Sequence, residues 1–241
     1  MVSFEKNQEK YLNMNLADKR EKYLCKASYV TLDDIPTWKE YSRNIKRNRP
    51  NKALEYKKDV RLNDKVSIFV GDITNLEIDA IINSTNNRLL CAAIQKGDAN
   101  ESTKVIHKEI HRAAGSALFS ECISLNGCEK GEARITGGYN LPAKYIIHTA
   151  GPVGWKPVLL RNCYLSCLNL AKENGLKTVA FPCISTGHCG YPNRDAAQVA
   201  LRTSREFLEE DVTEMDRIIF CLFQSIDVRV YESLMHNYFP V

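Results

Sequence analysis

The chain has 241 residues, 44% of them hydrophobic and 26% charged, which is the composition of an ordinary globular protein with one sizeable domain and a modest extension. No apolar run approaches the roughly 20 residues that span a bilayer, and the N-terminus lacks the apolar core of a secretory signal. We therefore expect no membrane partner and an intracellular protein, cytoplasmic or nuclear. The nine cysteines include no CxxC pair, so they indicate reduced core residues rather than a disulfide framework.

The formal net charge of +4 is unevenly placed. Residues 1–65 hold 16 Lys and Arg against 10 Asp and Glu, whereas the remainder holds 17 against 19. A basic patch of this strength could touch phosphates weakly, but it is more often a solvated helix face. The basic stretch 43–52 has no interleaved aromatic residues and the extension has no recognised module, so a nucleic-acid partner is not favoured.

The N-terminal quarter of the chain reads as a helical extension. Residues 5–26 favour one amphipathic helix or two, and residues 31–38 suit a turn followed by the first turn of a helix. Residues 43–52 are basic, rich in Asn and broken by Pro50, which predicts a linker or an exposed loop. We accordingly predict an extension with a basic linker over residues 1–60 and a domain over residues 61–241.

From Val66 onward, strand patterns alternate with helix patterns. The expected strands are 66–70, 78–83, 133–136, 145–149, 178–181 and 217–223. The expected helices are 103–122, 157–174, 193–208 and 228–238, the first because apolar residues recur there at helical spacing. This alternation predicts an α/β fold with a mixed or mostly parallel sheet between helices.

Ligands of such sheets bind where loops leave the carboxyl ends of the strands. The loops that follow Val70, Asn83, Thr149, Phe181 and Phe223 are therefore the places to look for a site. Their sequences are Gly71-Asp72-Ile73-Thr74, Asn83-Ser84-Thr85-Asn86, Ala150-Gly151-Pro152 and Ser185-Thr186-Gly187, with Phe223 at the end of the last strand.

These loops, together with Ile110-His111-Arg112-Ala113-Ala114-Gly115 and Leu141-Pro142-Ala143-Lys144-Tyr145, resemble the MacroD branch of the macrodomain family. With residues 141–152 counted as one segment, five segments occur in the family's order over about residues 60–241, and five in order are a strong signal. The resemblance implies a three-layer α/β/α macrodomain with a mixed central sheet, preceded by an N-terminal helical extension. It also implies ADP-ribose, free or attached to a protein, as the partner.

At the adenine end, the resemblance implies that Asp72 accepts from the N6 amino group and that the Ile73 N–H faces the base. The alternative for Asp72 is that it caps a turn or a helix start. Phe223 resembles the family's aromatic residue that stacks on adenine. Simple core packing is the alternative for Phe223.

At the ribose end, Asn86 resembles the asparagine that contacts the distal ribose, while Asn83 is expected to contact the ligand or fix the loop. Both side chains can donate and accept hydrogen bonds, as ribose hydroxyls require. The alternative is a plain Asn-rich turn.

Small residues between these ends predict a diphosphate cradle, because backbone N–H groups at a strand-to-helix junction bind anions. The cradle residues are Ser185, Thr186, Gly187, His188, Cys189 and Gly190. The family has Ile and Tyr where this chain has His188 and Cys189. The aromatic lid over the distal ribose is therefore absent unless Tyr191 replaces it.

The largest departure from the family lies between Leu90 and His111, where the family's glycine run is replaced by a longer, glycine-poor segment. Counting back from His111 puts His107 at the place of the family's catalytic Asp, which helps activate a water for attack on the distal ribose. A histidine can be a general base near neutrality. Alternatively, Asp98 or Glu101 folds back to supply a carboxylate.

Three functions follow from these observations. The chain is either a hydrolase that removes mono-ADP-ribose from acidic side chains, with Asn86 and His107 as catalytic residues, or a reader that binds ADP-ribose without turnover, or an interaction module. We expect a monomer with no cofactor and no metal. A zinc site made by Cys91, His107, His188 and Cys189 is the alternative, although its spacing does not match the zinc-carrying subgroup.

Overall fold

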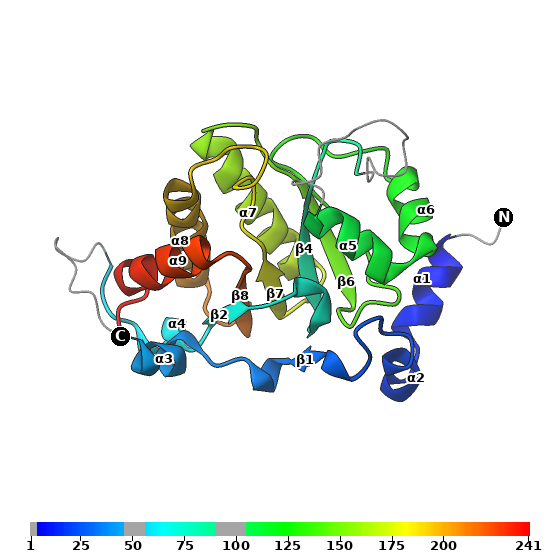
Figure 1. The fold of residues 1–241 in the computed structure, drawn as a ribbon, viewed down its shortest axis with the longest axis horizontal. Helices are drawn as coiled ribbons and strands as arrows, with labels where there is room; N and C mark the ends of the chain where they lie inside the picture. Colours follow the sequence, from blue (N-terminus) through cyan, green and yellow to red (C-terminus); the bar gives the residue numbers. More distant parts are fainter. Residues whose placement is uncertain (1–3, 46–55, 90–104) are drawn as a thin grey trace.

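A computed structural model describes residues 4–45, 56–89 and 105–241. Its centre is a six-stranded sheet in the order β2-β8-β7-β4-β6-β5 (Figure 1). The strands are β2 Val66–Val70, β4 Ala80–Thr85, β5 Ala133–Gly137, β6 Tyr145–Ala150, β7 Thr178–Phe181 and β8 Arg217–Leu222. All neighbouring strands are parallel except β5, which pairs antiparallel with β6. The mixed sheet expected from the sequence is confirmed.

Helices cover both faces of this sheet, because alternate residues of each strand point to opposite sides. In β4, Ala80 and Ile82 pack into the core shared with α7, α8 and α9, whereas Ile81 packs into the core shared with α5 and α6. These helices are α5 Val105–Ala114, α6 Ser116–Ser124, α7 Pro157–Glu173, α8 Asn193–Glu210 and α9 Ser225–Tyr238. The three-layer architecture is thus confirmed, and burial on both faces explains why the inner strands are apolar throughout.

The single helix expected over residues 103–122 is wrong in one respect, since two helices occupy this part of the chain. Gly115 ends α5 with φ of +87° and begins α6, a left-handed conformation that a residue with a side chain rarely adopts. A Cβ at this position would also lie 2.8 Å from Asn140 Nδ2. Helical periodicity continued through the glycine, so the break was not visible in the apolar pattern.

The N-terminal extension runs along the lower edge of the molecule in Figure 1. Its elements are α1 Phe4–Leu12, α2 Leu16–Arg20, β1 Val30–Thr31 and α3 Trp38–Tyr41, with 3-10 turns η1 Lys26–Ser28, η2 Leu32–Asp34 and η3 Ser42–Asn44. Strand β1 pairs in parallel with β3 Leu76–Glu77, which follows the turn η4 Ile73–Asn75, and α4 Val60–Asn63 precedes β2. The predicted linker falls mostly on residues 46–55, which lie outside the described residues.

The described part of the extension packs tightly on the domain. Trp38 is fully buried in the core of α7, α8 and α9, and its Nε1 donates to the carbonyl of Phe239 at 2.8 Å. Arg20 forms a two-pronged ion pair with Glu77, with Nε and Nη2 at 2.8 and 2.6 Å from the carboxylate oxygens. Such a fork of charge-assisted hydrogen bonds fixes orientation as well as contact. The extension therefore contributes side chains to the domain's own core.

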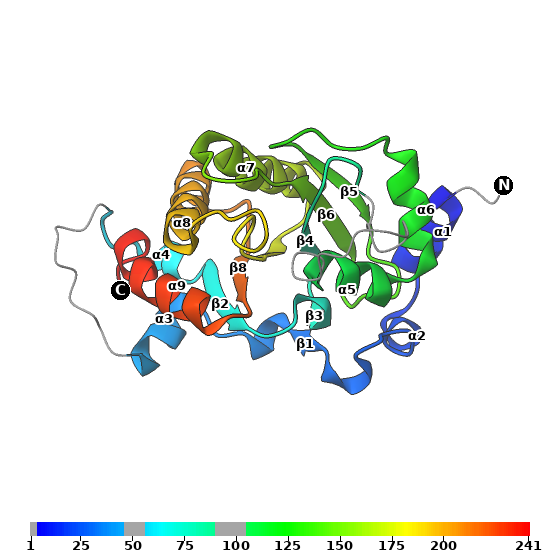
Figure 2. The same cartoon turned by 45° about the horizontal axis from the view of Figure 1, so that its top comes forward.

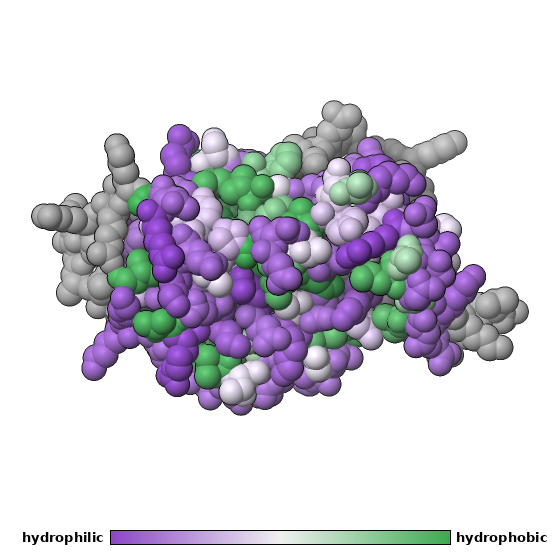
Figure 3. All heavy atoms as spheres, turned by 90° about the horizontal axis from the view of Figure 1, so that it is seen from below, coloured by the Kyte–Doolittle hydropathy of each residue, from purple (hydrophilic) through white to green (hydrophobic). Residues whose placement is uncertain are grey.

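The face seen from below in Figure 3 is hydrophilic over most of its area, with apolar side chains in small separate groups. Among the described residues, no helix combines the length and the apolar character needed to cross a membrane.

Candidate functional site

Asp72 and Phe223 lie side by side at the tips of two neighbouring parallel strands. The register pairs Val70 of β2 with Leu222 of β8, and the Gly71 N–H donates to the Leu222 carbonyl at 3.1 Å. Phe223 is 75% exposed, so it does not serve as a core residue. A large exposed aromatic ring beside a carboxylate can hold a flat, apolar group that carries a hydrogen-bond donor on its edge.

The Asp72 carboxylate has two roles available to it. Oδ1 accepts from the Thr74 N–H at 2.9 Å and from Thr74 Oγ1 at 2.7 Å, which caps the turn η4. Oδ2 accepts from no described residue, and the side chain is exposed. The capping alternative is thus present, and it leaves one acceptor oxygen for a ligand. The side chain of Ile73 is buried, while its N–H is the first amide of the turn and has no acceptor within it.

The loop after β7 presents consecutive backbone donors. Among the described residues, the N–H groups of residues 185–189 find no acceptor, whereas the next two amides close the loop by bonding Gly187 O and Ser185 O. Ser185 has a left-handed φ of +65°, the kind of backbone change that turns successive amides toward a common centre. This loop (yellow in Figure 2) therefore has a run of backbone donors that could bind an anion at the carboxyl end of β7.

The loop after β6 supports the loop after β7 by direct contact. A Cβ on Gly151 would lie 2.4 Å from Ser185 Oγ and 3.1 Å from Ile184 Cγ2, so only glycine lets the two loops approach this closely. The Gly154 N–H also donates to the carbonyl of Cys189 at 2.7 Å. These contacts hold the loop after β7 in place from the side of β6.

The remaining loop residues differ in exposure. His188, Gly187 and Gly190 are exposed, and Cys189 is half-buried with the pKa of its thiol raised by burial. Tyr191 is 1% exposed and belongs to the core of α7, α8 and α9, so it does not supply the aromatic lid. The chain turns inward immediately after Gly190, a change of direction that the residue types of the loop did not reveal.

Asn86 follows the end of β4 and is exposed. Its Oδ1 accepts from the Arg88 N–H at 2.9 Å, and its carbonyl accepts from the Leu89 N–H at 3.0 Å. The turn is thereby fixed by the side-chain oxygen. The sheet order puts Asn86 on the far side of the loop after β7 from Asp72 and Phe223.

Asn83 lies within β4, is fully buried, and joins two histidines. Its Nδ2 lies 2.8 Å from His107 Nδ1 and 2.9 Å from His148 Nδ1. Because an amide nitrogen only donates, both rings accept through Nδ1 and carry their proton on Nε2. The sequence expected Asn83 at the ligand or fixing the loop, and the structure gives it a contact with the helix α5.

The outer nitrogens of the same two rings face hydroxyl groups. His148 Nε2 lies 2.8 Å from Thr136 Oγ1, and His107 Nε2 lies 3.4 Å from Thr85 Oγ1. His107 is only 7% exposed, and the neutral ring of this arrangement has its one lone pair on Asn83. In this arrangement His107 has no nitrogen left to remove a proton from water.

A third histidine packs edge-on against His107, with ring centroids 4.5 Å apart. Burial lowers the pKa of His111 to about 4, and burial likewise holds the pKa of His148 well below its usual range. These rings are therefore neutral at physiological pH.

Within residues 4–45, 56–89 and 105–241, no group of three or more His, Cys, Asp and Glu could hold a metal ion. Cys91, the first residue of the zinc alternative, lies outside those ranges, as do Asp98 and Glu101.

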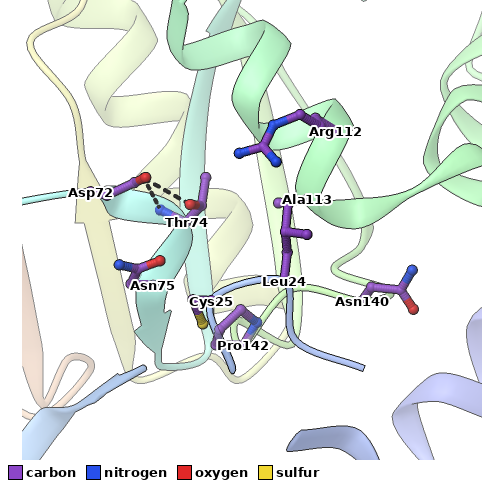
Figure 4. Close-up of a pocket in the computed structure, with 9 residues that line it drawn as sticks. All are labelled: Leu24, Cys25, Asp72, Thr74, Asn75, Arg112, Ala113, Asn140 and Pro142. Atoms are coloured by element: carbon purple, nitrogen blue, oxygen red, sulfur yellow. Dashed lines mark hydrogen bonds between the residues drawn. The ribbon is translucent and has the colours of Figure 1, made fainter. Parts of the chain in front are cut away.

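A cavity of about 230 Å³ adjoins Asp72 and was not expected from the sequence (Figure 4). It is lined by Leu24, Cys25, Asp72, Thr74, Asn75, Arg112, Ala113, Asn140 and Pro142. In Figure 4 the Arg112 side chain extends from α5 into the space facing Thr74. The cavity forms where the extension meets the domain, and no local pattern in either part signals that meeting.

The chain is similar to known proteins over nearly all of its length. The family model for the Macro domain matches residues 82–200. ADP-ribose glycohydrolase MACROD1 of Rattus norvegicus is 47% identical over 94% of this chain and 85% of the rat protein. ADP-ribose glycohydrolase MACROD2 of Mus musculus is 44% identical over 99% of this chain, which spans 49% of the length of that protein.

Solved structures agree with these sequence relatives. The crystal structure of the Trypanosoma brucei macrodomain in complex with ADP-ribose has a TM-score of 0.76 and 33% identity, covering 98% of this chain and 91% of that one. The macro domain of ganglioside induced differentiation associated protein 2 has a TM-score of 0.74 and 31% identity, covering 89% and 98%. Extended similarity in sequence and in fold places the chain in one family: it belongs to the macrodomains.

Proposed function

We propose that this macrodomain binds ADP-ribose along the carboxyl edge of its sheet, with adenine at β2 and β8, the diphosphate over β7 and the distal ribose at β4. The observation that carries the proposal is the order of chemistry along this edge. Strand order puts an exposed aromatic ring and a carboxylate first, five amides without an acceptor among the described residues next, and an exposed asparagine last.

At the adenine end, the hydrogen-bonding groups of the base match those of Asp72 and Ile73. The exocyclic amine is adenine's only hydrogen-bond donor once its sugar is attached, and Asp72 Oδ2 is an acceptor that no described residue uses. The Ile73 N–H can donate to a ring nitrogen of the same base. Phe223 offers its face for stacking, which is worth about 1–3 kcal/mol per base.

At the diphosphate, the amides of residues 185–189 supply charge-assisted hydrogen bonds, each worth about 1.5–3 kcal/mol. They come from backbone already held by Gly151 and Gly154, so little ordering is needed when the anion binds. The substitution of His188 and Cys189 for the family's Ile and Tyr leaves these backbone donors unchanged.

Hydrolysis of the ester that joins ADP-ribose to an acidic side chain is a second candidate function, favoured by 47% identity to a protein named ADP-ribose glycohydrolase. In this reaction the oxygen of water adds to the anomeric carbon of the distal ribose, and the bond from that carbon to the carboxylate breaks. One proton of the water stays on the new hydroxyl group of ADP-ribose, and the other leaves with the carboxylate product. Asn86, exposed just after β4, is our candidate to orient the water. His107 could act as the base only after its Nδ1 leaves the Asn83 amide.

Binding is tested by calorimetric titration with ADP-ribose and with its hypoxanthine analogue, whose 6-oxo group is an acceptor. The wild-type chain should prefer ADP-ribose, because a keto oxygen facing the Asp72 carboxylate would bring two hydrogen-bond acceptors together. Asp72→Asn should weaken that preference, since a carboxamide can donate to the keto group. Asp33→Asn, on the extension, is the control and should keep the wild-type preference. Absence of binding would overturn the proposal.

Hydrolysis is tested by incubating the chain with a glutamate-ADP-ribosylated protein and measuring released ADP-ribose. A hydrolase should release it, and Asn86→Ala should slow release more than it weakens binding of free ADP-ribose. Tight binding with no release would identify a reader instead.

A further inference from the structure

Three large apolar side chains lie exposed at one end of the ligand groove. Val153, Trp155 and Val158 are 58%, 64% and 71% exposed, and all fall between the end of β6 and the first turn of α7. We call these three residues the Trp155 patch. A soluble protein rarely exposes a tryptophan beside other apolar residues unless the group contacts a partner.

The position of the Trp155 patch follows from the strand order. Adenine at β2 and β8 and the diphosphate over β7 leave the distal ribose toward β4 and β6. The patch belongs to the loop that leaves β6, and the Gly154 N–H ties this loop to the Cys189 carbonyl at 2.7 Å. A chain attached to the distal ribose would then leave on the side of β4 and β6, where the loop that carries Trp155 begins.

We propose that the Trp155 patch is a docking surface for the polypeptide that carries the ADP-ribose. This inference rests on the proposed function, because it uses the direction in which ADP-ribose lies along the sheet edge. The patch contacts residues next to the modified side chain, and free ADP-ribose, which ends at the distal ribose, makes no use of it.

The charge around the patch suits an acidic polypeptide. Lys156 follows Trp155 directly, and Lys130 pairs with Ala150 at the end of β6 and lies close enough to Cys189 to influence its thiol. Both lysines are exposed, and neither forms an ion pair within the part of the chain that the structure describes. Acidic side chains flanking the modified residue would meet these cations, while apolar neighbours would cover Trp155.

The test compares two ligands in two variants by calorimetry. The ligands are free ADP-ribose and an acidic peptide ADP-ribosylated on glutamate, measured at low temperature and short times or with a non-hydrolysable linkage. Trp155→Ser should weaken binding of the modified peptide about 10-fold, as loss of an interface tryptophan does, and leave binding of free ADP-ribose unchanged. The control is Leu16→Ser, which removes a side chain 50% exposed on α2, away from α7 in Figures 1 and 2.

Each outcome has one meaning. Equal affinity of wild type and Trp155→Ser for the modified peptide overturns the docking surface while leaving ADP-ribose binding intact. Parallel loss of affinity for both ligands also overturns it, because the patch would then act on the groove itself. A wild-type chain that binds neither ligand refutes the proposed function instead.

Tryptophan fluorescence gives an independent readout, because the chain has two tryptophans in opposite environments. Trp38 is fully buried and Trp155 is exposed, so iodide quenches Trp155 selectively. The modified peptide should protect Trp155 from iodide, and free ADP-ribose should not. Unchanged quenching with saturating modified peptide would contradict the proposal.

Discussion

Two polar regions meet at the carboxyl edge of this sheet, and they treat their hydrogen-bonding groups in opposite ways. In the proposed ligand groove at the tips of β2, β8 and β7, Asp72 Oδ2 and the amides of residues 185–189 are left without partners in the described chain. In the cluster formed by Asn83, His107 and His148, the Asn83 Nδ2 bonds to both ring Nδ1 atoms and is shielded from solvent, while Asn83 Oδ1 is buried without a partner among the described residues. Exposed polar groups without partners indicate a binding site, whereas buried polar groups bonded to one another indicate stabilisation of the fold.

The largest expected effect on ADP-ribose binding comes from disturbing the support of the groove. Gly151→Ala puts a Cβ 2.4 Å from Ser185 Oγ and must displace the loop after β7. Loss of two amide–phosphate bonds should cost about 3 kcal/mol, or roughly 100-fold in affinity for ADP-ribose by calorimetry. Adding Ser185→Ala removes the clashing oxygen and should recover part of that loss. Ser185→Ala alone is the control, because this oxygen has no hydrogen-bond partner among the described residues. Wild-type affinity in Gly151→Ala would refute the contact.

The next effect concerns the buried cluster. Asn83→Ala leaves two buried ring nitrogens without their donor and should lower the free energy of unfolding by about 2–3 kcal/mol, measured with urea. Asn87→Ala is the matched control, because Asn87 is exposed and bonds to Cys128 only through its backbone carbonyl, so its effect should stay within about 0.5 kcal/mol. If Asn83→Ala is as stable as wild type, the cluster does not support the fold.

The amino-acid sequence predicts these two regions unequally well. The groove was predictable because strand patterns are local and parallel strands end at a common edge, so Asp72, Ser185 and Phe223 could be placed from their order alone. The cluster was not, since which ring nitrogen of His107 is occupied depends on Asn83, 24 residues away. The burial of Tyr191, which depends on packing, and the cavity lined by Leu24 were likewise not predictable from local sequence patterns.

A third prediction uses pH to separate the two regions. His111 and His148 have pKa values below the ordinary 6.5, mainly through burial, so the unfolded chain binds more protons than the folded one as pH falls below 6.5. Stability should thus be complete above pH 6.5 and decline between pH 6.5 and about 4, by up to about 1.4 kcal/mol per pH unit for each histidine.

This pH dependence is measured by urea unfolding at pH 8, 7, 6 and 5. His111→Leu removes one of the titrating rings, together with an Nε2 that is buried without a partner, and should flatten the decline. His188→Gln changes an exposed ring of the groove and should leave the decline unchanged. An identical decline in all three proteins would mean that buried histidines do not set it.

The smallest effect tests whether an exposed groove residue can matter for binding and not for folding. Phe223 is 75% exposed, so Phe223→Ala should change the free energy of unfolding by no more than about 0.5 kcal/mol. The same change should weaken ADP-ribose binding about 10-fold, because stacking on the base is lost. Ile226→Ala, 44% exposed at the start of α9, is the control for loss of apolar surface nearby. A fall in stability without a fall in affinity would assign Phe223 to packing, and the adenine end of the groove would then lose its aromatic wall.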